Sequence, residues 1–136
     1  FGGIALANAG VGAAHALAYP MGGEHQVPHG IANGLLLPYV MEFNLESNIE
    51  KFSRIAEAMG ERNQGFSALE FAEKSVSAVK KLIEDVKVPS RLRELGIPES
   101  AIEGLSSGAM KVTRPIENNP RKVTKEDAIE IYRRAY

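Results

Sequence analysis

Residues 15–30 read HALAYPMGGEHQVPHG, and the rest of the chain is organised around this stretch. It holds all three histidines of the 136-residue sequence: His15, His25 and His29. The residues on either side, 8–14 and 30–41, are small or apolar, which predicts buried helices at both ends of the stretch. Imidazoles placed between two buried helices indicate a functional site.

Length and composition predict one domain, residues 1–136, with a core of its own. Apolar residues make up 44% of the sequence and charged residues 24%, as in an ordinary soluble globular protein. The net charge of −1 gives no general attraction to nucleic acid or to acidic membranes, so we expect neither as a partner.

The sequence also predicts a cellular compartment. Cysteine is absent, which excludes disulfides and thiolate metal sites and is compatible with a reducing environment. The most apolar run, Ile31–Phe43, is too short to span a bilayer, and no signal peptide is visible. We therefore expect a cytoplasmic protein.

The first residues, FGGIALA at positions 1–7, lie inside an apolar segment, whereas natural termini are usually polar and loosely held. This start predicts a fragment of a longer protein.

Apolar periodicity predicts an all-α fold of about seven helices, since no alternation is long enough to indicate a strand. The first helix is expected over about residues 4–18 and should be buried. Gly10 and Gly12 weaken its helix propensity, which is tolerable if another backbone approaches closely there. Pro20 and the pair Gly22–Gly23 are expected to end it, and a loop should follow.

The second helix is expected to begin near Pro28, because proline is favourable at the first helical position. His29 then lies in its first turn. Pro38 removes a backbone hydrogen bond well inside this helix and predicts a kink, and Asn44 is a plausible end.

Later helices begin at recognisable caps. Residues 47–50 and 67–70 both have the Ser-x-x-Glu pattern of a capping box ahead of an amphipathic run. Pro98 is expected to start a helix that ends near Met110, and Thr124 should cap the last one.

His15 and His29 are candidate metal ligands, because neutral imidazole is the commonest metal-binding side chain. Two histidines do not complete a zinc or ferrous site, which needs three or four protein ligands. His25 is four residues before His29, but the prolines and glycines around it predict a loop rather than a chelating helix. The alternative for each histidine is a structural, hydrogen-bonded role, and spacing alone does not decide between the two.

Tyr19 follows His15 by one helical turn, so both side chains should point into the same space. It could meet a substrate or cofactor, or it could be a buried tyrosine with a satisfied hydroxyl. Glu24 is a further possible ligand, although a lone loop carboxylate is usually solvated.

Three segments of the chain closely resemble the iron-containing (group III) alcohol dehydrogenases. They are NAGVGAAHALAYPMG at 8–22, PHGIANGLLLPYVMEFN at 28–44 and NPRKVTKED at 119–127. The interval between His15 and His29, with proline before the second histidine and glycine after it, is specific, and the resemblance covers essentially the whole chain.

This resemblance implies the C-terminal helical domain of a dehydroquinate-synthase-like two-domain fold, whose N-terminal α/β domain binds NAD or NADP. It implies that His15 and His29 are two metal ligands, while an aspartate and a histidine upstream of this chain supply the others. The implied metal is Fe(II), with Zn or Mn in some relatives, and it would polarise the oxygen of a small alcohol or aldehyde.

Two positions depart from the family pattern. Tyr19 stands where many members have a histidine near the nicotinamide, and Leu6 stands where an aromatic residue is common. A phenol with an ordinary pKa near 10 is a poor proton shuttle at neutral pH, so the role of Tyr19 is packing or contact with substrate and nicotinamide. Leu6 lacks the aromatic ring of the family pattern, so the resemblance does not carry over a ring contact with the nicotinamide from this position.

The leading hypothesis is the metal-site domain of an NAD(P)-dependent alcohol dehydrogenase or aldehyde reductase, with no turnover by this chain alone. One alternative is a non-enzymatic helical module whose histidines are structural or bind metal loosely. Another is a relative of glycerol dehydrogenase or dehydroquinate synthase. Without a partner domain, we expect an exposed apolar face on the first two helices, through which the chain could form a homo-oligomer.

Overall fold

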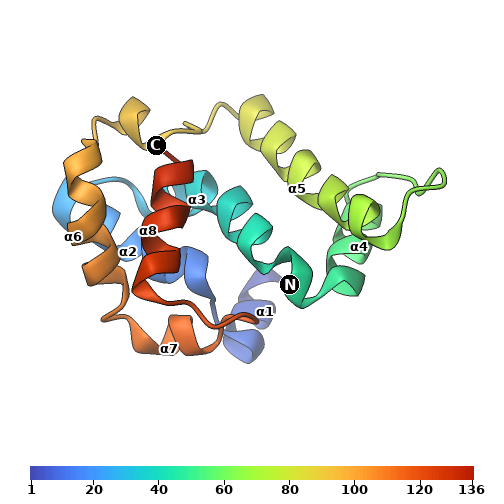
Figure 1. The fold of residues 1–136 in the computed structure, drawn as a ribbon, viewed down its shortest axis with the longest axis horizontal. Coiled ribbons are helices and arrows are strands. Elements are labelled where there is room, and N and C mark those ends of the chain that lie inside the picture. Colours follow the sequence, from blue (N-terminus) through green and yellow to red (C-terminus); the bar gives the residue numbers. More distant parts are fainter.

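The computed structural model describes residues 1–136, apart from the side chain of Ala5. The all-α prediction is confirmed, because the described residues form helices and no strand. Three short 3-10 helices accompany eight α-helices (Figure 1). The elements are α1 (Gly2–Ala9), α2 (Ala13–His25), α3 (His29–Asn44), η1 (Leu45–Ser47), α4 (Ile49–Ala58), α5 (Ala68–Asp85), η2 (Leu92–Leu95), η3 (Glu99–Ala101), α6 (Ile102–Ala109), α7 (Thr113–Glu117) and α8 (Lys125–Arg134).

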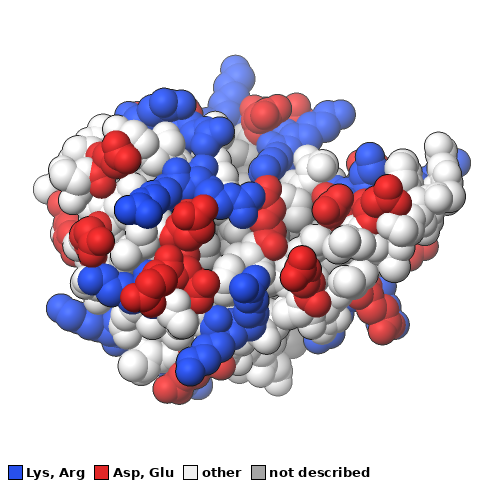
Figure 2. All heavy atoms as spheres, viewed as in Figure 1, with Lys and Arg blue, Asp and Glu red and all other residues white. Residues whose placement is uncertain are grey.

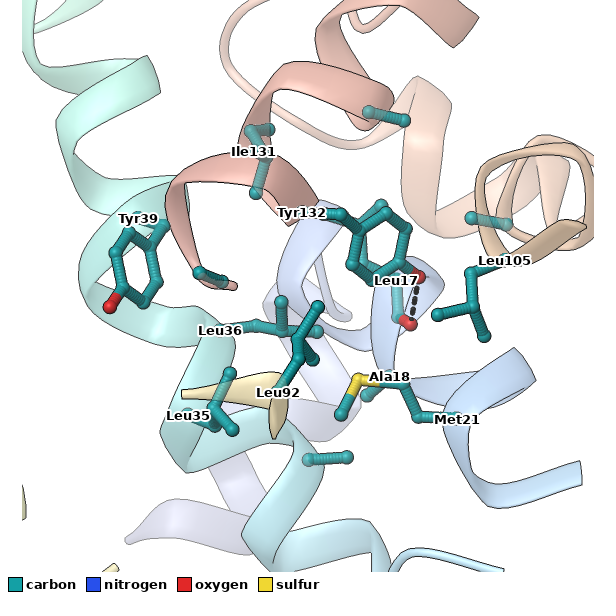
Figure 3. Close-up of a cluster of buried hydrophobic side chains, with 14 of the residues drawn as sticks. Leu17, Ala18, Met21, Leu35, Leu36, Tyr39, Leu92, Leu105, Ile131 and Tyr132 are labelled. Carbon is teal, nitrogen blue, oxygen red and sulfur yellow. Dashed lines mark hydrogen bonds between the residues drawn. The ribbon is translucent and has the colours of Figure 1, made fainter. Parts of the chain in front are cut away.

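The main core lies between α2, α3, α6 and α8, which pack against one another. Helix α2 contributes alanines alternating with larger side chains, so its backbone can approach its neighbours closely. Tyr132 of α8 is fully buried in this core, and Figure 3 shows its hydroxyl group directed at the carbonyl oxygen of Leu17. The other large side chains that are completely buried include Met21, Leu35, Leu36, Leu92, Ile97 and Leu105.

A second, smaller core forms where the hairpin of α4 and α5 packs against the end of α3. The hairpin projects to the right of Figure 1, beyond the main helical body. Phe52 and Ala56 of α4 are buried, as the amphipathic pattern predicts. The members that contact one another are Met41, Leu45, Phe52, Ala72, Val76, Val79 and Ile83.

The prediction of one buried helix over residues 4–18 is wrong. The chain forms α1 and α2 with a break at residues 10–12, and Gly10 there has φ +69°. A left-handed backbone favours glycine and interrupts the helix. The described side chains of α1 are exposed, so this helix does not belong to the core.

The prediction that Pro20 and Gly22–Gly23 end the helix is also wrong, because α2 continues to His25. Since α2 begins only at Ala13, Pro20 loses just one backbone hydrogen bond late in a helix that is buried against α3 and α6. The helix ends instead at Gln26, whose backbone is left-handed with φ 56°.

Two of the three N-caps predicted from the sequence are confirmed. Ser67 with Glu70, and Thr124 with Asp127, form complete capping boxes at α5 and α8. At α4 the cap is Asn48, whose side chain accepts a hydrogen bond from the Lys51 amide. Ser47 belongs to the preceding 3-10 turn and donates its hydroxyl to the Asn44 carbonyl, so its predicted capping role is wrong.

Charged side chains of both signs are interspersed over the face shown in Figure 2, in keeping with the small net charge. Several pair across helices. Glu42 of α3 accepts from both Lys80 of α5 and Arg134 of α8, and so ties the two cores together. None of the helices that the structure describes has the length and apolarity needed to cross a membrane.

Candidate metal centre

Two helix N-termini bring the candidate histidines together. His15 is the third residue of α2, and His29 is the first residue of α3. Pro28 precedes His29 as the N-cap residue, close to the predicted start of that helix. The two helices pack side by side, so residues fourteen positions apart in sequence meet at one end of the main core.

The rings of His15 and His29 lie close together. Their centroids lie 5.2 Å apart and the ring planes are inclined by 58°. The Tyr19 ring is next to this pair, with its centroid 5.6 Å from that of His29. The His29 ring therefore lies beside both His15 and Tyr19.

The separation of the two imidazoles fits a shared metal ion. A metal–nitrogen bond of about 2.1 Å places a ring centroid about 3.2 Å from the metal, so two rings at a tetrahedral angle are about 5 Å apart. The chain offers only two such ligands here, because no cluster of three or more histidine, aspartate or glutamate side chains occurs among the described residues. The residues present fit half of a metal site.

Burial and charge both favour the form of His15 that binds metal. Burial lowers the pKa of His15 below its ordinary value of 6.5, and the neighbouring His29 lowers it further. A lower pKa leaves the imidazole neutral at physiological pH, and only the neutral ring has a lone pair for a metal.

Asn33 is a neighbour of the pair to which the sequence alone assigned no role. It lies one turn after His29 on α3, and its amide nitrogen is 3.1 Å from His29 Nε2 and donates to the His29 carbonyl at 3.0 Å. Its side-chain oxygen is buried and has no hydrogen-bond partner within the described part of the chain. The spacing of four residues from His29 was the signal that could have identified it.

Leu6 and Tyr19 line the same cleft, of about 790 Å³, between α1, α2 and α7. Tyr19 is 49% exposed and Leu6 is 55% exposed, so neither is a packed core residue. The alternative of a buried tyrosine is therefore wrong. Because Tyr19 also contacts His29, this cleft opens directly beside the histidine pair.

The remaining candidates lie elsewhere. The Glu24 carboxylate is directed at α6, where a Cβ atom added at Gly108 would be 3.4 Å from its Oε1. His25 is the last residue of α2 and half-buried, a full helix length from His15. The structure therefore groups His15, His29 and Tyr19, and separates them from the other two.

Comparison with known proteins yields a match to one family over the whole chain. The family model described as "Fe-containing alcohol dehydrogenase family, C-terminal" matches residues 1–136. Among curated proteins, the 1,3-propanediol dehydrogenase of Klebsiella pneumoniae is 41% identical over 134 residues, which are 98% of this chain and 34% of that protein. The NAD-dependent methanol dehydrogenase of Bacillus methanolicus is 34% identical over 133 residues, 98% of this chain and 35% of its own.

Solved structures agree. A crystal structure of 1,3-propanediol oxidoreductase superposes with a TM-score of 0.94 at 41% identity, covering 98% of this chain and 35% of that one. The chain thus spans about one third of the length of the relatives it matches.

Proposed function

Because this chain belongs to the Fe-containing alcohol dehydrogenase family, as its C-terminal part, we propose that it holds the metal site of a nicotinamide-dependent alcohol dehydrogenase or aldehyde reductase. The substrate class is a small alcohol or the corresponding aldehyde, as the names of both relatives indicate for those proteins. The cofactor is NAD or NADP. The proposed location of the protein is the cytoplasm, whose reducing conditions suit a sequence without cysteine.

The observation that carries the proposal is the convergence of His15 and His29. The two imidazoles lie 5.2 Å apart, a separation that suits two ligands of one metal ion, and the lowered pKa of His15 favours its metal-binding form. Fe(II), or Zn or Mn in its place, would act as a Lewis acid that polarises the substrate oxygen.

The other residues of the site orient and enclose the reactants. Tyr19 stands beside His29 and lines the cleft with Leu6, so the two side chains form an apolar wall for the substrate and the nicotinamide ring. An apolar wall excludes water from the reacting carbon and so favours hydride transfer over side reactions. The Asn33 amide nitrogen lies 3.1 Å from His29 Nε2, so Asn33 is next to the ring on α3.

A site with two protein ligands is incomplete, since mononuclear catalytic sites use at least three. We propose that the missing ligands, an aspartate and a histidine, and the dinucleotide-binding α/β domain belong to a segment outside residues 1–136. On this proposal, the 136-residue chain alone has no dehydrogenase activity.

The surface of the first two helices is the proposed contact with that α/β domain. Phe1, Ile4 and Leu6 of this region are more than half exposed, and Tyr19 lines a cleft together with Leu6. Without the α/β domain, copies of the chain should associate through this apolar surface. Sedimentation should show concentration-dependent association, which Leu6→Glu weakens, whereas a monomer at high concentration would contradict it.

Calorimetry of Zn(II) binding tests the metal role directly. We expect the variants His15→Ala and His29→Ala each to weaken binding at least tenfold, as loss of one of two ligands should. His25→Ala is the matched control, because it removes an imidazole that lies outside the pair, and it should bind like the parent chain. Equal affinity in all four proteins would overturn the proposal.

A nicotinamide absorbance assay tests the proposal that the 136-residue chain alone has no dehydrogenase activity. The 136-residue chain with Fe(II), NAD and 1,3-propanediol should produce no NADH. Sustained NAD reduction by this chain would show that the proposed division of the site between two segments is wrong.

A further inference from the structure

Two buried asparagines join segments that are distant in sequence. Asn119, in the connection from α7 to α8, and Asn44, the last residue of α3, face each other with their amide groups. Asn44 Nδ2 donates to Asn119 Oδ1 at 3.0 Å, and Asn119 Nδ2 donates to Asn44 Oδ1 at 2.7 Å. Asn119 Nδ2 also donates to the Arg121 carbonyl at 2.6 Å, so both of its hydrogen atoms are used.

The same Asn119 reaches the start of α2. Its Oδ1 accepts a hydrogen bond from the backbone amide of Ala13, the first residue of that helix, at 3.3 Å. The N-cap residue of α2 is Gly12, which has no side chain to satisfy the free amides of the first turn. Asn119 therefore supplies, from 106 residues away, an acceptor for one of the free amides of the first helical turn.

The preceding residue, Asn118, bonds to the segment that joins α1 to α2. Its Nδ2 donates to the carbonyls of Ala9 at 2.7 Å and Val11 at 3.1 Å. The close approach favours glycine, because a Cβ at Gly10 would be 3.1 Å from Asn118 Nδ2 and one at Gly12 would be 3.3 Å from Asn119 Oδ1. The nearest atoms at these glycines belong to the side chains of Asn118 and Asn119, whereas a close backbone was expected.

We propose that Asn119 is a positioning residue for His15, and so for the metal site, an inference that rests on the proposed function. His15 is only two residues beyond Ala13, and its own amide bonds to the Gly12 carbonyl in the first helical turn. Loss of this contact frees the first turn, and a residue that leaves the helical backbone no longer holds its side chain in one direction. Through Asn44, the same amide pair also connects the turn to α3, the helix that carries His29.

Three variants separate positioning from stability. Asn119→Ala removes every contact of the side chain. Asn119→Asp keeps the oxygen that accepts from Ala13 but loses both donated bonds, to Asn44 and to Arg121. Val76→Ala, in the second core around α4 and α5, is the control, because it destabilises the chain without touching α2.

The measurements are the urea midpoint, the Zn(II) affinity, hydrogen exchange of the Ala13 amide, and the NMR cross-relaxation between the His15 and His29 rings. All three variants should lower the urea midpoint. Asn119→Ala should weaken Zn(II) binding at least tenfold, accelerate exchange at Ala13 and remove the ring contacts. Asn119→Asp and Val76→Ala should keep the ring contacts and bind Zn(II) within threefold of the parent chain.

The proposal is overturned if Zn(II) affinity in all three variants simply follows the loss of stability, or if Asn119→Ala keeps the ring contacts. If the parent chain binds no Zn(II), the proposed function fails separately. The exchange and ring-contact measurements then still decide whether Asn119 positions His15, since neither requires metal.

Discussion

Tyr132 of α8 donates its hydroxyl hydrogen bond to the carbonyl oxygen of Leu17 on α2, at 2.5 Å and across 115 residues of sequence (Figure 3). Both residues are fully buried, so the bond connects the last helix of the chain to the helix that carries His15. Leu17 is two residues beyond that histidine. Packing of α8 is thereby linked to the proposed metal site through one buried phenol.

Removing this hydroxyl should destabilise the chain without unfolding it. Tyr132→Phe keeps the ring that fills the core and loses one buried hydrogen bond, which costs about 1–2 kcal/mol. Urea unfolding followed by circular dichroism measures the change. Tyr39→Phe is a matched control, because the Tyr39 hydroxyl bonds only to the Ser90 carbonyl at the edge of the core, and its loss should cost less. An equal loss in both variants would contradict the structural role given to Tyr132.

The same tyrosine should make stability depend on alkaline pH. Burial, the main cause, and the charge of Glu24 raise the pKa of Tyr132 far above its ordinary value of 10.0. Above pH 10 the unfolded chain releases this proton and the folded chain retains it, so stability is undiminished below pH 10 and falls as the pH rises further. Urea midpoints measured on either side of pH 10 should fall less steeply in Tyr132→Phe than in the parent chain. Identical slopes would show that Tyr132 ionises normally.

His15 should titrate below its ordinary pKa of 6.5. Below pH 6.5 the unfolded chain binds a proton at this ring more readily than the folded chain, so its contribution to stability is full above pH 6.5 and declines as the pH falls through the lower folded pKa. NMR of the ring protons gives the pKa directly. In His29→Ala it should rise but stay below 6.5, because burial is the larger cause of the shift and His29 the smaller. If this substitution leaves the pKa of His15 unchanged, the two rings are not electrostatically coupled.

The caps at α4 and α5 make a further prediction. Ser67→Ala and Asn48→Ala each remove an N-cap oxygen that accepts a backbone amide, and each should cost about 1 kcal/mol in the free energy of unfolding. Ser47→Ala should cost less than about 0.5 kcal/mol, since Ser47 is exposed and caps no helix. Urea denaturation distinguishes the three, and a larger loss for Ser47→Ala than for Asn48→Ala would restore the sequence-based assignment.

Local signals accounted for most helix boundaries. The Ser67 and Thr124 capping boxes, and the start of α3 next to Pro28, depend on neighbouring residues in the chain and were predicted correctly. Ser47 and Asn48 offered two adjacent caps, and local sequence does not say which one the backbone will use. The choice depends on the 3-10 turn that ends α3.

Non-local contacts explain what the sequence could not predict. Gly10 permits the break between α1 and α2, but Asn118 and Asn119, more than 100 residues away, hold it, and no window around Gly10 contains them. The pairing of His15 and His29, in contrast, was expected from the family resemblance, because their spacing alone also allowed separate structural roles. The surroundings of the pair, such as the Asn33 contact and the cleft shared by Leu6 and Tyr19, required the arrangement of α1, α2, α3 and α7 in space.

Replacement of Tyr19 by histidine should complete a metal site within this chain. Tyr19 lies one turn after His15 on α2 and beside the His29 ring, so an imidazole there would add a third candidate ligand next to the pair. Catalytic zinc sites use three protein ligands and a water, so Tyr19→His should bind Zn(II) at least about tenfold more tightly than the parent chain. Tyr19→Phe keeps the ring without a ligand and should bind like the parent. Because the position is half-exposed, calorimetry on both variants should report metal binding without a loss of folding. Equal affinity in Tyr19→His and Tyr19→Phe would mean that the three side chains do not share a metal-sized space.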